Sequence, residues 1–418
     1  MKISLRISAL WLASVLSGAA QPDSQIAPDL GTISSPNIVK PTNALSGQEV
    51  ADRKFQAQLD LAGRQRHAGS PAMAILSLVN ILETNAPTEF KRKALFELAL
   101  AYQDNHDFVK AQQIYAQYLQ LYPEDERAPE VLLRQGLLFR RMGVNTMAIS
   151  KFYSVMSTAL KLKLGDIDYY KNLVLQAQTE IADTYYVQGQ YSESANYYTR
   201  LLSADSPSLN KQQIEFKLIR SLSFSTNRDE TISRSEKFLE RFPDYPDVPE
   251  IRFILSSAYT AVGRNSAALK QVLVLLQSQE TNAHTNPELW GYWQRRTGNE
   301  IANQLYKEGD YLDALQIYQN LAALDSAPDW QAPALYQVGL VFEQLQQWQR
   351  ASDTYDQILA RRPEMTGSNA PPSLSSLYSM AQWRKDYIAW LQKARAADQQ
   401  LQHSNLQPPS IAKITAAK

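Results

Sequence analysis

The side chains that most often carry chemistry are scattered along this 418-residue chain. None of the four histidines has a second histidine at the spacing of a metal-binding motif; they are His67, His106, His284 and His403. The sequence has no cysteine, which excludes disulfides, thiolate nucleophiles and cysteine metal ligands. It also lacks a Gly-rich phosphate loop, a GxSxG elbow and an HExxH motif. We therefore expect no catalytic residue, no metal site and no cofactor.

The charge of the chain is balanced. Lys and Arg total 42, and Asp and Glu also total 42; without residues 1–20, which hold Lys2 and Arg6 and no acid, 40 basic residues stand against 42 acidic ones. A nucleic-acid binder usually shows a basic excess or a basic stripe. The adjacent arginines are pairs rather than patches, namely Arg140 with Arg141 and Arg295 with Arg296. The balanced charge therefore argues against nucleic-acid binding. Because no pair of acidic residues stands in an apolar setting, we also expect no enzymatic activity.

Three aromatic residues form the densest candidate anchor for a partner: Trp290, Tyr292 and Trp293. They stand in a segment, residues 277–296, that interrupts the spacing of the helices on either side. They could form an exposed binding anchor. They could equally begin a long helix that packs on the preceding helices, since aromatic residues at helical spacing are usually core.

The stretch Leu95–Pro123 shows which elements would position such residues. Apolar residues recur at helical spacing in two sets, Leu95, Leu98, Ala99 and Tyr102, and then Ala111, Tyr115 and Tyr118. Residues 105–107 form the expected turn, and Pro123 ends the second helix. Ala99 and Ala111 lie where two antiparallel helices would cross, and small side chains there allow the backbones to approach closely.

The same order recurs along the chain. A small residue precedes another by twelve positions at Ala62 and Ala74, Gly136 and Ala148, Ala182 and Ser194, Ser256 and Ala268, Ala302 and Ala314, and Gly339 and Ala351. Lys211–Pro243 has helical periodicity without this crossing, and we interpret it as a degenerate copy. The pattern resembles the tetratricopeptide repeat, a helical hairpin of about 34 residues. The resemblance implies an all-α fold, a right-handed α-solenoid of about seven to eight hairpins over residues 49–363 with a concave inner surface.

The N-terminal region carries the features of export. Lys2 and Arg6 precede an apolar run over residues 7–16 and then small residues, which predicts a secretory signal peptide over residues 1–20. The run is shorter than the roughly 20 residues that span a bilayer, so we expect no integral membrane segment after cleavage. Ala19 stands where a lipoprotein signal needs cysteine, so we expect no lipid anchor there. Residues 21–48, rich in Pro, Ser, Thr and Asn, are expected to be a disordered linker.

The C-terminal region is predicted to close the array of hairpins. Residues 364–373 are expected to be a linker, residues 374–401 a capping helix, and residues 402–418 a disordered tail. The apolar side of the capping helix is predicted to comprise Leu377, Met380, Ala381, Trp383, Tyr387 and Leu391.

The resemblance also implies a binding surface, because in this family certain positions of each first helix face the concave groove. By register, the groove would receive Arg140, Arg141, Asp183, Tyr186, Arg296, Asn299, Asn303, Tyr306 and Lys307. The last five form the densest polar and aromatic cluster, which suits an extended peptide. The family's peptide-carboxylate clamp has a lysine where this chain has Asn299.

Two junctions extend the resemblance. An aromatic residue, then Tyr122–Pro123 or Phe242–Pro243, then a short spacer leads into a new helix. Such junctions are similar to those of bacterial periplasmic tetratricopeptide proteins, including the BamD-like lipoprotein of the outer-membrane assembly machine and the Tol-Pal coordinator. The resemblance implies a periplasmic or outer-membrane-associated adaptor that binds protein or peptide partners. The alternative is a structural solenoid that self-associates through its outer helix faces and residues 290–293.

Overall fold

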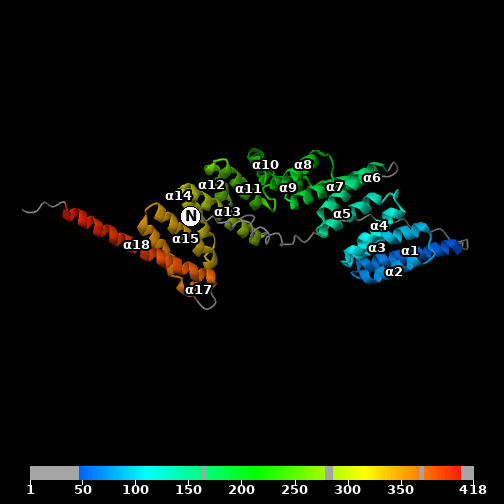
Figure 1. Ribbon diagram of the computed structural model, residues 1–418, viewed down its shortest axis with the longest axis horizontal. Helices are drawn as coiled ribbons and strands as arrows, with labels where there is room; N and C mark the ends of the chain where they lie inside the picture. The colour runs from blue at the N-terminus through cyan, green and yellow to red at the C-terminus, as the bar shows by residue number, and fades with distance from the viewer. Residues whose placement is uncertain (1–46, 162–165, 278–285, 367–370, 406–418) are drawn as a thin grey trace, which may run out of the picture. The chain divides into compact units, whose positions relative to one another are not determined.

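The computed structural model describes residues 47–161, 166–277, 286–366 and 371–405, which form eighteen helices and no strand (Figure 1). The chain divides into two compact units, residues 1–54 and 55–418. The predicted signal peptide, residues 1–20, lies outside the described residues, and so does the predicted linker up to residue 46. The predicted tail also lies outside them from residue 406 onward.

Sixteen of the helices follow one another as eight consecutive hairpins. Their bounds are α1 (Gly47–His67) and α2 (Pro71–Glu83), α3 (Thr88–Asp104) and α4 (Phe108–Leu121), α5 (Ala128–Arg141) and α6 (Asn145–Lys161), α7 (Ile167–Val187) and α8 (Tyr191–Ser203), α9 (Lys211–Ser223) and α10 (Arg228–Arg241), α11 (Val248–Ala261) and α12 (Asn265–Gln277), α13 (Pro287–Glu308) and α14 (Tyr311–Leu324), and α15 (Pro328–Gln344) and α16 (Trp348–Leu359). From α2 to α16 each helix contacts the next one. The predicted all-α array of helical hairpins is therefore confirmed.

The small residues predicted at the crossings are buried. In the second hairpin Ala99 and Ala111 are both 0% exposed. In the third and the eighth hairpins the first helix carries glycine at the crossing, and the ring of the second helix fills the space of a side chain. A Cβ atom on Gly136 would lie 2.4 Å from the Phe152 ring, and one on Gly339 would lie 2.4 Å from the Tyr355 ring. The identity of these residues therefore follows from close helix packing.

The degenerate copy at Lys211–Pro243 is also a hairpin, formed by α9 and α10. The register places Ile219 and Thr231 at its crossing, and both are fully buried. The Thr231 hydroxyl donates to the backbone carbonyls of Leu222 and Asn227, so its polar group is satisfied. This crossing holds larger side chains than the others, which explains the weak sequence pattern.

Most turns between the two helices of a hairpin need one residue in the left-handed region. Gly309 supplies it between α13 and α14 with φ of +87°. His106 supplies it between α3 and α4 with φ of +61°, and its ring lies at the edge of Phe108. His106 therefore serves the geometry of the turn, and it is exposed.

Two more helices follow the hairpins, α17 (Arg362–Thr366) and α18 (Pro372–Asn405). α17 begins before the predicted linker and overlaps it, and α18 is longer than the predicted capping helix at both ends. α18 packs on α15, α16 and α17. The array therefore ends in a covering helix, as expected.

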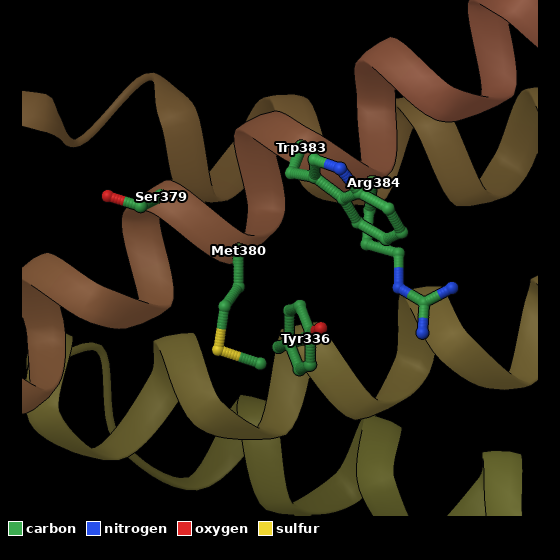
Figure 2. A pocket seen from close by; sticks show the side chains of 5 residues that line it. All are labelled: Tyr336, Ser379, Met380, Trp383 and Arg384. Atoms are coloured by element: carbon green, nitrogen blue, oxygen red, sulfur yellow. The ribbon is translucent and has the colours of Figure 1, made fainter.

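The predicted apolar side of α18 is wrong for three of its residues. Leu374, Ala381 and Ile388 face the hairpins and are buried, whereas the exposed group comprises Met380, Trp383 and Tyr387. This orientation buries Leu374, Ala381 and Ile388 in the core of the last hairpins, and it is accompanied by ion pairs of Arg384 with Glu343 of α15 and of Lys385 with Asp356 of α16. An open hollow of ≈ 350 Å³ lies beside this face. Figure 2 shows the side chains that line it, Tyr336, Ser379, Met380, Trp383 and Arg384.

A substitution at a crossing glycine tests this packing. We expect Gly339→Ala to lower the free energy of unfolding by about 1–3 kcal/mol, since the added methyl group meets a Tyr355 ring that is held by its hydrogen bond to Glu343. Urea denaturation followed by circular dichroism measures the change.

Gly63→Ala is the matched control, because Gly63 is also helical and a Cβ atom there has nothing within 4 Å. We expect it to stabilise the chain by about 0.5–1 kcal/mol through helix propensity. Equal effects of the two substitutions would contradict the packing described above.

Candidate interaction surface on the first helices

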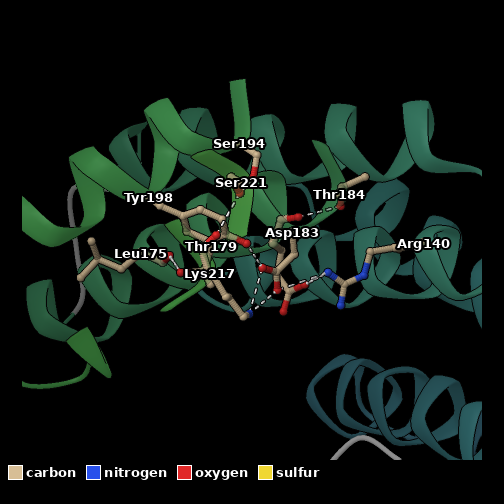
Figure 3. Close-up of polar contacts among 10 residues, drawn as sticks. Arg140, Leu175, Thr179, Asp183, Thr184, Ser194, Tyr198, Lys217 and Ser221 are labelled. Carbon is tan, nitrogen blue, oxygen red and sulfur yellow. Dashed lines mark hydrogen bonds and ion pairs between the residues drawn. The ribbon is translucent and has the colours of Figure 1, made fainter. Parts of the chain in front are cut away.

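The first helices of the third, fourth and fifth hairpins are joined by an ion network (Figure 3). Lys217 of α9 lies 2.8 Å from Asp183 of α7, and Arg140 of α5 lies 3.9 Å from the same carboxylate. Arg140 also forms an ion pair with Glu180. The Tyr198 hydroxyl, from α8, donates to Asp183. One aspartate thus links three hairpins.

Burial governs the electrostatics of this network. Desolvation raises the pKa of Glu180, although the Arg140 guanidinium opposes the shift. Desolvation and the Asp183 carboxylate together raise the pKa of Tyr198.

The row of charges continues onto α11. Arg220 of α9 lies 2.8 Å from Glu250, and its guanidinium lies 5.4 Å from the ring centre of Tyr186. Burial raises the pKa of Glu250, and the attraction of Arg220 only partly offsets this effect. For Arg220 desolvation lowers the pKa, but the combined attraction of Glu250 and of weaker neighbours such as Tyr186 and Asp247 exceeds it, so the pKa is raised. The salt bridge therefore carries a desolvation cost at its carboxylate end.

The fourth and seventh hairpins carry the same constellation of side chains, displaced by 120 positions. The pairs are Glu180 and Glu300, Asp183 and Asn303, Tyr186 and Tyr306, Tyr191 and Tyr311, and Tyr198 and Tyr318. In both hairpins the first two tyrosines meet edge to face with ring centres 5.3 Å apart. In both, the last tyrosine donates its hydroxyl proton to the residue on the first helix, with an oxygen–oxygen distance of 2.6 Å for Tyr318 and Asn303.

The two constellations differ in what neighbouring helices add. Lys217 and Arg140 close the first one around Asp183. In the second, Glu300 pairs only with Arg296 of its own helix at 3.8 Å, and among the described residues no cation from another helix binds Glu300 or Asn303. Asn303 is exposed, so its amide protons remain available to a partner. We call Asn299, Asn303, Tyr306 and Lys307 of α13 the α13 face. It lacks the ion pairs with neighbouring helices that close the corresponding face of α7 around Asp183.

The predicted groove residues fall into two groups on the structure. Arg140, Asp183 and Tyr186 belong to the ion network and its edge, whereas the α13 group comprises Arg296, Asn299, Asn303, Tyr306 and Lys307. Arg141 belongs to neither, since it is exposed with its guanidinium 5.3 Å from the Phe108 ring centre. Arg296 lies over the Phe253 ring at 4.8 Å.

The exposed-anchor hypothesis is wrong for Trp290 and Trp293, which are 4% and 8% exposed. Asn286 caps α13 by accepting from the Leu289 amide, so the helix starts early and its first turns lie against the preceding hairpin. Trp290 packs with Val248 and Leu275, and the Trp293 ring lies 5.3 Å from Phe253. The long packed helix, the second possibility, is what the structure contains. Tyr292 alone is exposed, and its hydroxyl accepts a hydrogen bond from Arg296.

Sequence reasoning missed the members of the network that are half-buried acids and their partners: Glu180, Lys217, Arg220 and Glu250. One signal was present. Two positions before the crossing residue, the first helices of four successive hairpins carry charges of alternating sign, in Glu97, Arg134, Glu180 and Lys217. Alternation between neighbouring hairpins favours ion pairs across them rather than solvated faces.

Within the described part of the chain, no group of three His, Asp or Glu side chains is placed to hold a metal ion. Across those same residues, every helix is too short or too polar to cross a membrane.

Comparison with known proteins identifies the repeats. A tetratricopeptide repeat family model matches residues 93–125 and 333–364, which correspond to the α3–α4 and α15–α16 hairpins. The matched repeats support a protein–protein interaction scaffold. No curated protein matches the chain in sequence.

Solved structures that resemble the chain include bacterial tetratricopeptide proteins. One is the C-terminal part of such a protein from Cytophaga hutchinsonii, 14% identical over 64% of this chain and 95% of that one, with a TM-score of 0.48. A second, from Parabacteroides merdae, is 15% identical over 70% and 98% of the two chains, with a TM-score of 0.40. A third is PilW, a type IV pilus biogenesis factor, 16% identical over 55% and 96%, with a TM-score of 0.38. At these values no function transfers from them.

The difference between the two constellations predicts unequal costs of substitution. Asp183→Ala leaves Lys217 and the Tyr198 hydroxyl without a partner, so we expect a loss of about 2–3 kcal/mol in unfolding free energy. Asn303→Ala leaves only the Tyr318 hydroxyl, and we expect a loss of about 1 kcal/mol. Urea denaturation of the two variants makes the comparison, and a larger loss for Asn303→Ala would overturn the description of α13 as the open face.

The raised pKa of Glu250 predicts a pH dependence. Because its folded pKa exceeds its unfolded value of about 4.3, Glu250 contributes most below that value, and the contribution is lost as pH rises through the folded pKa. The stability of the wild type relative to Glu250→Gln should therefore fall as the pH rises above the unfolded pKa, as measured by urea midpoints.

Glu89→Gln is the matched control for this measurement. Lys93 lowers the pKa of the fully exposed Glu89, so the wild type should gain rather than lose relative to that variant as pH rises. A relative stability of Glu250→Gln that moves in the same direction as Glu89→Gln would contradict the assignment.

Proposed function

We propose that the chain is a non-catalytic scaffold that holds a protein or peptide partner on the α13 face, through Asn299, Asn303, Tyr306 and Lys307. One observation carries the proposal: the chain builds the same constellation twice, and only the α13 copy lacks cations from neighbouring helices. Polar groups that the fold leaves open on a rigid helix are available for recognition.

The chemistry of the face indicates the kind of partner. The Asn299 and Asn303 amides can pair with the backbone of an extended segment, and Tyr306 offers a ring edge and a hydroxyl. Burial raises the pKa of Tyr306, so its hydroxyl keeps its proton and can donate. Lys307 is exposed at the end of this row and favours an acidic group on the partner.

The cell envelope is the proposed location. The pattern of residues 1–20 supports export to the periplasm or the periplasmic face of the outer membrane. The junctions at Tyr122–Pro123 and Phe242–Pro243 favour a role in outer-membrane assembly or cell-wall coordination, by their similarity to the assembly lipoprotein and the Tol-Pal coordinator.

A second candidate function is self-association, the structural alternative. A specific observation favours it, namely the exposed aromatic side chains of α18. It does not compete with the α13 face for the same residues, so one chain can carry both functions.

Crosslinking and affinity capture from the native envelope test the scaffold function. We expect the wild type to capture a defined protein and a variant with Asn299→Ala, Asn303→Asp and Tyr306→Phe to lose most of it, about tenfold or more. Aspartate keeps the acceptor for Tyr318, and phenylalanine keeps the ring contact with Tyr311, so the hairpin is preserved.

The control variant carries Gln316→Ala and Gln319→Ala, two exposed positions on α14 of the same hairpin. It should capture the partner as the wild type does. Equal capture by all three proteins would mean that the α13 face is ordinary helix surface.

A further inference from the structure

The covering helix α18 exposes a row of large apolar side chains. Met380, Trp383, Tyr387 and Trp390, here called the α18 stripe, are 48%, 60%, 38% and 61% exposed. The rings stack along the helix, with centres 5.7 Å apart for Trp383 and Tyr387 and 6.0 Å apart for Tyr387 and Trp390. A row of large apolar side chains exposed to solvent indicates an interaction site.

The spacing of the stripe identifies its geometry. Its members alternate at intervals of three and four residues, which are the a and d positions of a heptad. The next two a and d positions hold Ala394 and Ala397, and both are exposed. The buried residues Ala381 and Ile388 follow one position after stripe residues, about 100° around the helix. The a and d positions therefore form a face of α18 that lies next to the face covering the hairpins.

We propose that α18 pairs with α18 of a second copy of this chain as an antiparallel two-helix seam. The first argument is the size of the side chains. In an antiparallel pair centred between Tyr387 and Trp390, those two residues face each other. Trp383 then faces Ala394 and Met380 faces Ala397, so each large side chain meets a small one.

The second argument is charge. In the same alignment the g positions face one another, which places Asp386 opposite Lys393 of the second copy, twice by symmetry. Both side chains are exposed, and among the described residues neither forms an ion pair within its own chain. The remaining g positions place Ser379 opposite Gln400, which are compatible polar groups.

A parallel pair fits less well. It would place each residue of the stripe against its own copy, with tryptophan on tryptophan and alanine on alanine, which gives a seam of uneven width. Asp386 would then face Leu391, and Lys393 would face Asp398. The direction of the pair is thus a prediction that charge exchange can test.

The surroundings of α18 leave room for the second helix. Every residue from Gln392 to Gln402 is exposed, although Arg395 lies over the Trp348 ring of α16, and Figure 1 shows the red end of α18 extending away from α15. The hollow lined by Tyr336, Met380 and Trp383 borders the other end of the stripe (Figure 2), where the alanine-bearing end of the partner helix would lie.

The available area suits a specific but reversible dimer. From the exposed fractions, the three aromatic side chains offer roughly 350 Å² per copy. With Met380, the alanines and the stems of the g residues, two copies bury on the order of 1,000 Å², near the lower limit of stable interfaces. The dimer uses no residue of the α13 face, so it stands or falls independently of the scaffold function.

The experiment measures the molar mass of the purified full chain by sedimentation equilibrium over about a hundredfold range of concentration. The wild type should approach the mass of a dimer. Asp386→Lys and Lys393→Asp should each raise the dissociation constant about tenfold or more, because like charges then face each other. An equimolar mixture of these two variants should restore the dimer, and so should the double variant.

Three results overturn the proposal. A wild type that stays monomeric throughout excludes the dimer. A dimer that persists when Trp383→Ala and Trp390→Ala are combined excludes the α18 stripe as its seat. A double variant that stays weak excludes the antiparallel direction, because in a parallel pair Lys393→Asp faces Asp398 and exchange cannot rescue it. Circular dichroism shows whether each variant keeps its helices.

Discussion

The contact on which the rest of the structure depends is the close crossing of the two helices in each hairpin. At Gly339 the backbone of α15 meets the Tyr355 ring of α16 so closely that no side chain fits. At Ala99 and Ala111 the two helices also cross closely, and both methyl groups are fully buried. Because a small residue must occupy this point, the aromatic residues around it are fixed to the interior, and the register of both helices is fixed with them.

Fixing the register determines which positions remain for function. Residues two before, one after and four after the crossing lie along one side of the first helix, since steps of three return to nearly the same side. In α7 these are Glu180, Asp183 and Tyr186, and in α13 they are Glu300, Asn303 and Tyr306. The fold therefore presents the same three positions in every hairpin, and only their side chains vary.

The crossing is local in sequence, and this explains what could be predicted. Gly339 and Ala351 are twelve positions apart and identify their hairpin without any structure, as did the other pairs. The partners of Asp183 could not be found in this way, because Lys217 and Arg140 lie on other hairpins and their reach depends on how the helices stack. Trp290 and Trp383 also show that helical spacing in the sequence does not tell whether an apolar residue is buried or exposed. Both are apolar residues at helical spacing, yet Trp290 is buried by a neighbouring hairpin, whereas Trp383 is exposed because α18 buries Leu374, Ala381 and Ile388 instead.

Whether a position becomes structural or functional is thus decided by the neighbouring hairpin. Asp183 is half-buried between two cations, where its charge holds three hairpins in register and leaves little for a ligand. The seventh hairpin has asparagine at this position, and no neighbouring helix among the described residues supplies a cation. A neutral amide needs no counter-charge in that setting, and unlike a carboxylate it adds two N–H donors beside the accepting oxygen. Asn at this position therefore keeps the hydrogen bond from the second-helix tyrosine and adds two amide protons, and this difference from Asp183 is the basis of the binding proposed for α13.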